Sequence, residues 1–236
     1  MKAEINGFSF EVEEHGFWPH FNTVWEMDTK LLYAKYTFPD KTIIDIGTWI
    51  GPTVLIGYAN NAKHIYAIEA DPVNAFILNK NCRRNHIEDR VTIINRCIYP
   101  VSNEIILFGE CINNGDTSTK SLGGNTKVLS ATLTDIIKEN NIEISDVSLV
   151  KIDIEGSELF LIRDLKKLSV YKNFVILLSL HQQFWHRIPA KPEALQVLFE
   201  CYDFFASDET PIAQENIASY INNRTGCLLV LKPKAL

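Results

Sequence analysis

The residues best suited to chemistry in this chain are four acids and a histidine that stand where apolar runs end. Asp45, Glu69 and Asp153 each stand at or near the end of such a run, Glu155 follows two residues after Asp153, and His181 stands at the end of a further run. Parallel strands end at one edge of their sheet, where such folds bind ligands, so we expect these side chains to gather there. Carboxylates bind hydroxyls and hard cations, and a histidine in this place is either a general base, a metal ligand or a structural residue.

The elements that must position these residues alternate regularly along the chain. Apolar runs typical of strands cover residues 42–46, 64–69, 91–95, 148–153, 173–180 and 227–231. Pro52 and Pro72 follow the first two runs, and proline is favoured at the first position of a helix. Continuous apolar strands that alternate with helices are typical of a parallel sheet covered on both faces. The sequence therefore predicts an α/β fold with a doubly wound, mostly parallel sheet.

The first 38 residues differ from the rest and are expected to form a short extension of a single domain. Residues 5–12 predict a strand or hairpin, aromatic residues follow, and residues 22–36 predict a helix. Residues 39–236 then form the catalytic α/β core, with a strand and a short helix expected over 126–137. The polar, glycine-rich stretch 115–124 is expected to be a loop, either a lid over the site or a disordered insertion.

Composition narrows the class of protein. With 236 residues, 46% hydrophobic and 22% charged, the chain is typical of a globular domain. Its net charge of −6 argues against nucleic acid as a partner, because an acidic surface repels phosphates. The five cysteines, none at CxxC spacing, are expected to be reduced thiols of a cytoplasmic protein. Neither a signal peptide nor an apolar stretch long enough to span a bilayer is expected.

The segment from Asp45 to Gly51 has the form of a ligand-binding turn. Gly47 allows a sharp exit from the strand, and the spacing is GxxxG, with Trp49 in place of the middle glycine of a dinucleotide fingerprint. A ligand without a pyrophosphate, such as S-adenosylmethionine, fits this spacing better than NAD. Asp45 could then hold water or the amino group of the methionine portion. A purely structural turn from strand to helix is the alternative interpretation.

The segment Glu69-Ala70-Asp71-Pro72 follows the second strand. An acid at that position can accept hydrogen bonds from both hydroxyls of a ribose, which serves NAD and S-adenosylmethionine alike. We therefore interpret Glu69 as a ribose ligand. Asp71 is expected to cap the next helix, at least in part.

The segment from Lys151 to Glu158 places three acids close together at the end of the fourth strand. Their repulsion must be offset by a sulfonium, a metal ion, Lys151 or a proton. Asp153 and Glu155 are candidate ligands of a hard cation. Glu158 could instead reflect only the preference for acids at a helix N-terminus.

Taken together, the segments 45–52, 69–72 and 151–158 resemble the FkbM family of S-adenosylmethionine-dependent methyltransferases, over about residues 25 to 181. The resemblance implies a Rossmann-like, class I methyltransferase sheet of seven strands with an antiparallel last strand. It also implies methylation of an oxygen, often on a sugar or polyketide. Ser179 departs from the family, in which an acid often precedes the histidine. Cys97 stands where many methyltransferases place an acid near the adenine.

Two sets of candidate site residues follow. The candidate contacts of the cofactor are Asp45, Gly47, Trp49, Gly51, Glu69, Ala70, Asp71, Cys97 and Asp153. The candidate catalytic residues, which could also bind a divalent cation such as Mg²⁺, are Asp153, Glu155 and His181. In this hypothesis a base or a cation activates a hydroxyl of a small molecule or sugar, which attacks the sulfonium methyl group.

Two other functions remain open at the level of sequence. An NAD-linked oxidoreductase would share the sheet and Glu69 but would need the pyrophosphate-binding glycines. A noncatalytic nucleoside-binding module would keep the fold without turnover.

Overall fold

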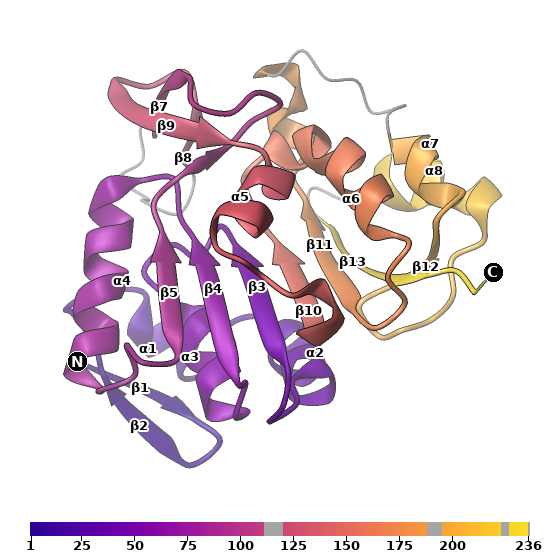
Figure 1. Ribbon diagram of the computed structural model, residues 1–236. Helices are drawn as coiled ribbons and strands as arrows, with labels where there is room; N and C mark the ends of the chain where they lie inside the picture. Colours follow the sequence, from indigo (N-terminus) through magenta and orange to yellow (C-terminus); the bar gives the residue numbers. More distant parts are fainter. Residues whose placement is uncertain (111–119, 188–194, 223–226, 236) are drawn as a thin grey trace.

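The core of the computed structural model is one sheet of seven strands (Figure 1). From edge to edge these are β12 (Tyr202–Phe205), β13 (Cys227–Pro233), β11 (Val175–Leu180), β10 (Val147–Ile152), β3 (Thr42–Ile46), β4 (His64–Ile68) and β5 (Val91–Ile94). The last strand, β13, runs antiparallel to both neighbours, and the pairs from β11 to β5 are parallel. The predicted α/β fold and its mostly parallel sheet are confirmed, whereas β12 was not predicted. The structure describes residues 1–110, 120–187, 195–222 and 227–235.

Helices pack on both faces of this sheet. The α-helices are α1 (Trp18–Phe21), α2 (Met27–Tyr36), α3 (Pro52–Ala59), α4 (Pro72–Arg84), α5 (Leu133–Glu139), α6 (Ile162–Leu168), α7 (Gln196–Phe199) and α8 (Gln214–Asn222). Neighbouring residues of one strand enter different cores, because side chains alternate along a strand. Ile43 and Leu149 join the cluster that contains residues of α2, α3 and α4. Ile44 and Val150 join the cluster formed with α5 to α8.

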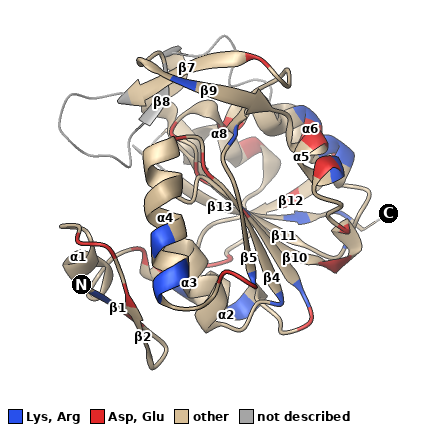
Figure 2. Cartoon of the chain, turned by 60° about the vertical axis from the view of Figure 1, so that its left-hand side comes forward, with Lys and Arg blue, Asp and Glu red and all other residues tan. Residues whose placement is uncertain are grey.

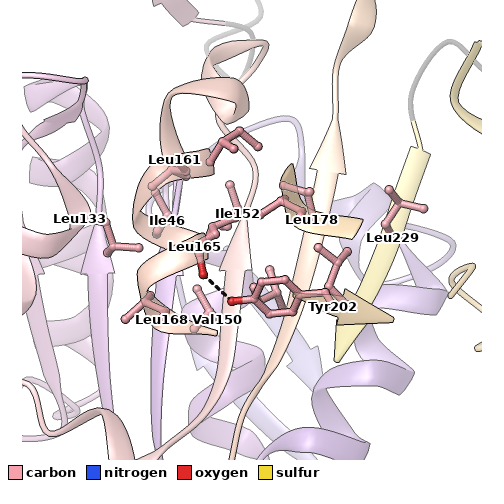
Figure 3. Close-up of a cluster of buried hydrophobic side chains, with 14 of the residues drawn as sticks. Ile46, Leu133, Val150, Ile152, Leu161, Leu165, Leu168, Leu178, Tyr202 and Leu229 are labelled. Atoms are coloured by element: carbon pink, nitrogen blue, oxygen red, sulfur yellow. Dashed lines mark hydrogen bonds between the residues drawn. The ribbon is translucent and has the colours of Figure 1, made fainter. Parts of the chain in front are cut away.

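Figure 3 shows the second cluster, where α6 lies over β10 and β11. Leu165 and Leu168 of α6 are buried against Val150 and Leu178, and each such side chain contributes roughly 1.5–3 kcal/mol. The Tyr202 hydroxyl donates a 2.6 Å hydrogen bond to the Leu165 carbonyl, which ties β12 to the helix layer. The outward sides of α5 and α6 carry charges of both signs (Figure 2). Within the described ranges, no helix combines the length and the apolarity needed to cross a membrane.

The N-terminal segment packs on the α3 side of the sheet. Of the two alternatives predicted for residues 5–12, the structure has the hairpin, which begins earlier and is formed by β1 (Lys2–Ile5) and β2 (Phe8–Glu11). Trp18 and Phe21 are buried with Ile43. The helix predicted over 22–36 is confirmed only from Met27, as α2, and residues 22–26 are not helical. The chain forms the short α1 and then α2, because Glu26 between them has a left-handed backbone (φ 39°) that cannot continue a helix.

A second, smaller sheet lies over one end of the main sheet (Figure 1). Its strands, in order across the sheet, are β6 (Cys97–Ile98), β9 (Thr126–Ala131), β7 (Ile105–Glu110) and β8 (Lys120–Leu122). The strand and helix predicted over 126–137 correspond to β9 and α5. The loop predicted over 115–124 contains strand β8, and its residues 115–119 lie outside the described residues. Short 3₁₀ helices in the described ranges include η1 (Ile144–Asp146), η2 (Ser157–Leu161) and η3 (Gln182–Arg187).

Candidate functional site

The turn after β3 requires glycine at two positions. Gly47 has φ 80°, and a Cβ there would lie 1.7 Å from the Asp153 carbonyl oxygen. Its N–H donates to the Ile68 carbonyl at 2.9 Å, so the turn lies tightly between β10 and β4. At Gly51, with φ 101°, a Cβ would lie 2.5 Å from Cδ1 of Leu78 in α4. Gly47 therefore shapes the site, whereas Gly51 allows two helices to pack closely.

Glu69, at the end of β4, is buried with its carboxylate held by backbone. The Trp49 N–H donates to Oε2 at 2.7 Å and the Asp71 N–H donates to Oε1 at 2.8 Å. Burial raises the pKa of Glu69 to about 7, although these two hydrogen bonds oppose the change. Asp71 itself accepts from the N–H groups of Val73 and Asn74 and so caps α4, as predicted.

Glu69 lines a first cavity between the turn and the small sheet. Its other walls include Gly47, Trp49, Ala70, Cys97, Phe108, Asp153 and Glu155. Six of the nine predicted cofactor contacts lie here: Gly47, Trp49, Glu69, Ala70, Cys97 and Asp153. Burial raises the pKa of the Cys97 thiol to about 12, so it is a neutral part of the wall. Cysteines 82, 97, 201 and 227 form no disulfide with one another, and Cys111 lies outside the described residues.

Asp45 is placed differently from its prediction. Its side chain is fully buried and does not line any of the cavities described here. Lys151 Nζ lies 3.6 Å from Asp45 Oδ1 and 3.6 Å from Asp153 Oδ2, and it donates to the Gly47 carbonyl at 2.8 Å. Burial raises the pKa of Asp45 and Lys151 opposes that change. The sequence left four candidates for offsetting the repulsion between the acids, and the structure places one of these, Lys151, between Asp45 and Asp153.

Asp153, Glu155 and His181 come together as predicted. His181 Nε2 lies 3.6 Å from Asp153 Oδ1 and 3.7 Å from Glu155 Oε1, and one ligand atom from each residue fits within a 4.8 Å group. Burial opposes protonation of His181, but the Glu158 hydrogen bond and the charge of Asp153 outweigh it and raise the pKa to about 10. This raised pKa favours the protonated ring in the free site. Action as a base or cation ligand requires a bound positive charge that displaces the proton.

Glu158 has a role that the sequence did not reveal. It is buried, it accepts from the Gly156 N–H at 3.0 Å, and it pairs with His181 Nδ1 at 3.0 Å. The Trp185 indole N–H also donates to it at 3.4 Å. Glu158 thus fixes the His181 ring with Nε2 directed toward the other acids, which is more than a preference for acids at a helix start.

Two further cavities adjoin the first. The second, of about 380 Å³, shares Gly47, Trp49, Asp153 and Glu155 with it. The third, of about 410 Å³, lies between the start of α2 and the ends of β11 and β13, and it shares Glu26, Asp153 and His181 with the second. Asp153 lines all three cavities. A ligand in the first cavity can therefore reach the second past Gly47, and a different ligand can approach Asp153 from the third.

Three residues of the second cavity hold a left-handed backbone without being glycine. They are Glu26 (φ 39°), Trp49 (φ 51°) and Glu155 (φ 50°). Such conformations are costly and cluster at functional sites. Phe17 and Trp25 complete an aromatic wall, their ring centroids 5.3 Å apart. The contribution of Glu26 was missed, because nothing in the local sequence indicates its backbone conformation.

Comparison with known proteins identifies a family for the chain. The family described as "Methyltransferase FkbM domain" matches residues 45–205. A curated ribosomal protein L11 methyltransferase from Carboxydothermus hydrogenoformans is 35% identical over 60 residues, 25% of this chain and 20% of its own length. The chain thus spans about a fifth of that relative.

Two solved structures show the same fold. One is precorrin-6y C5,15-methyltransferase from Geobacter metallireducens, with a TM-score of 0.50 and 11% identity over 96% of this chain and 94% of that one. The other is an O-methyltransferase from Bacillus cereus in complex with SAH, with a TM-score of 0.50 and 14% identity over 89% and 82% of the two chains.

Proposed function

Because the chain belongs to the FkbM methyltransferase domain family, we propose that it transfers the methyl group of S-adenosylmethionine to a hydroxyl oxygen of a sugar or other small molecule. The observation that carries the proposal is the meeting of three cavities at Asp153. Two ligands can enter from different sides and meet beside the acids and His181. Bound S-adenosylmethionine supplies an electrophilic methyl group on a sulfonium.

The residues that line the first cavity are of the types that bind a nucleoside. Its Glu69 carboxylate can accept hydrogen bonds from ribose hydroxyls in addition to its backbone donors, since each carboxylate oxygen has two acceptor sites. Cys97, Ile98 and Phe108 supply an apolar wall for a base. The GxxxG turn, with Trp49 in the place of a glycine, favours this cofactor over NAD and a methyltransferase over an NAD-linked oxidoreductase.

A hydroxyl acceptor fits the third cavity. Its lining is acidic and hydroxylated, with Glu26, Asp28, Thr29 and Ser179, and it includes neither lysine nor arginine among its described residues. Such walls hydrogen-bond a polyol and repel phosphates, which argues against nucleic acid as the acceptor. Asp153 and Glu155 orient the hydroxyl and take its proton, while His181 is held in place by Glu158. These four ionisable groups also argue against a noncatalytic module.

The same acids and imidazole suit a divalent cation. Two carboxylates and one imidazole within 4.8 Å are a donor set for a cation such as Mg²⁺ or Mn²⁺. A cation held by Asp153, Glu155 and His181 would lower the pKa of a hydroxyl that it binds. We include this cation in the proposal as a requirement to be tested.

The experiment compares the native protein with His181→Ala and, as a matched control, His20→Ala. His20 is exposed and its side chain is not part of the site. Transfer of labelled methyl groups to a panel of hydroxylated small molecules is measured with and without Mg²⁺, and S-adenosylmethionine binding is measured by calorimetry. We expect His181→Ala to abolish transfer and to change cofactor affinity less than twofold, with His20→Ala unaffected. Loss of both transfer and binding in His181→Ala would overturn its assignment.

A further inference from the structure

The second cavity contains a buried hydroxyl that lacks a partner. Thr48 and Thr53 line this cavity and are at most 2% exposed, and Thr48 Oγ1 makes no hydrogen bond within the described part of the chain. A buried hydroxyl without a partner costs about 1–3 kcal/mol. Thr53 also stands in the first turn of α3, where backbone N–H groups have no partner within the helix. Both features suit a ligand that presents a carboxylate.

The same cavity also contains one carboxylate that is available for a cation. Among its acids, Asp153 and Glu155 both face His181, and Asp153 also faces Lys151. Glu26 makes no ion pair within the described residues. Its Oε2 accepts a 2.8 Å hydrogen bond from Thr29 Oγ1, which leaves Oε1 to face the cavity or the solvent.

The position of Glu26 is fixed by its own segment. Glu26 is the residue directly before α2, and its backbone is left-handed. Thr29, whose hydroxyl donates to the Glu26 carboxylate, is buried in the first turn of α2. An energetically unfavourable backbone at this point keeps the carboxylate at the mouth of the second cavity.

We infer that Glu26 binds the ammonium group of the amino-acid tail of the cofactor, so that the N-terminal segment completes the cofactor site. The inference rests on the proposed function. With the ribose at Glu69, the tail passes Gly47 into the second cavity, which shares Gly47 and Trp49 with the first. There its carboxylate meets the Thr48 and Thr53 hydroxyls and its ammonium meets Glu26.

Two cofactor-related probes test this inference without knowledge of the acceptor. S-adenosylhomocysteine carries the amino-acid tail, whereas 5′-methylthioadenosine lacks it. Calorimetry measures the affinity of both for the native protein, for Glu26→Gln and for Glu14→Gln. Glu14 lies in the same N-terminal segment, is exposed, and gives the same change of charge away from the cavities.

We expect Glu26→Gln to weaken S-adenosylhomocysteine roughly ten- to a hundredfold, the range for a hydrogen bond to a charged group, and to leave 5′-methylthioadenosine unchanged. Unchanged binding of the second probe also shows that the variant is folded. Glu14→Gln should affect neither probe. Equal weakening of both probes, or weakening of neither, would overturn the inference; the latter would assign Glu26 to the acceptor side. Native protein that binds neither probe would instead contradict the proposed function.

Discussion

Burial of Glu69 should make the stability of the protein depend on pH in a way that a single substitution removes. Glu69 is 6% exposed, and its surroundings raise its pKa from 4.5 to about 7. The folded protein therefore holds a proton at Glu69 more tightly than the unfolded chain does. In Glu69→Gln the group does not titrate, and this contribution to the pH dependence disappears.

The sign and size of the effect follow from linkage. Because the folded pKa lies above the unfolded one, the stabilisation is complete below about pH 4.5 and is lost as the pH rises through about 7. The full difference corresponds to about 3 kcal/mol of unfolding free energy, of which about 2.5 kcal/mol is lost between pH 5 and pH 8. The backbone donors at Trp49 and Asp71 are present at both pH values, so their mismatch with the amide cancels in the comparison.

The assay is urea unfolding of the native protein and of Glu69→Gln at pH 5 and at pH 8. Subtracting the two pH dependences removes the contributions of histidines and other groups common to both proteins. We expect the native protein to lose about 2.5 kcal/mol more than the variant over this range. Parallel pH dependences would refute the argument, because they would mean that Glu69 ionises at its ordinary pKa in the folded state.

Three further predictions concern the scaffold around the site. Gly47→Ala should destabilise the protein by more than about 3 kcal/mol in urea unfolding, because the new Cβ would lie 1.7 Å from a backbone oxygen. The control is Gly7→Ala: Gly7 has φ 83° and open space around it, so this change should cost only the backbone strain. Tyr202→Phe removes the hydrogen bond to the Leu165 carbonyl and should cost about 1 kcal/mol by the same measurement; no change would show that the bond is replaced by water. Hydrogen bonds from Lys and Tyr side chains lower the pKa of Glu209 to about 2, so Glu209→Gln should lose about 1 kcal/mol of unfolding free energy at neutral pH. This difference between variant and native protein should shrink as the pH falls from about 4.5 toward 2. A difference that stays constant with pH would mean that the pairing is absent.

Local signals account for what could be predicted from the sequence. Continuous apolar runs and the prolines at 52 and 72 mark where buried strands end and helices begin, and both helices start at those prolines. Asp71 caps α4 as expected, because a cap depends only on residues next to it. The small sheet was largely missed, since its pairs are decided by contacts between residues distant in the sequence, such as Cys97 with Ser130 and Ile105 with Leu129.

The missed parts of the site depend on contacts between distant residues. Glu158 meets His181 across 23 positions, because the register of β10 and β11 brings their ends together. Glu26 lines the same cavity as Asp153 and has a left-handed backbone. Glycine and asparagine are the residues that usually signal such a backbone, and neither stands at this position. Asp45 was expected in the cofactor site, but the Asp45 side chain is fully buried, and Lys151 lies between Asp45 and Asp153.

Calorimetric titration of the native protein and of Glu69→Ala with S-adenosylmethionine and, separately, with NAD tests the assignment of the cofactor site most directly. We expect the native protein to bind S-adenosylmethionine and not NAD, and removal of the Glu69 carboxylate to weaken this binding roughly tenfold or more. Binding of NAD alone, or of neither ligand, would show that the cavity at Glu69 does not hold the methyl donor.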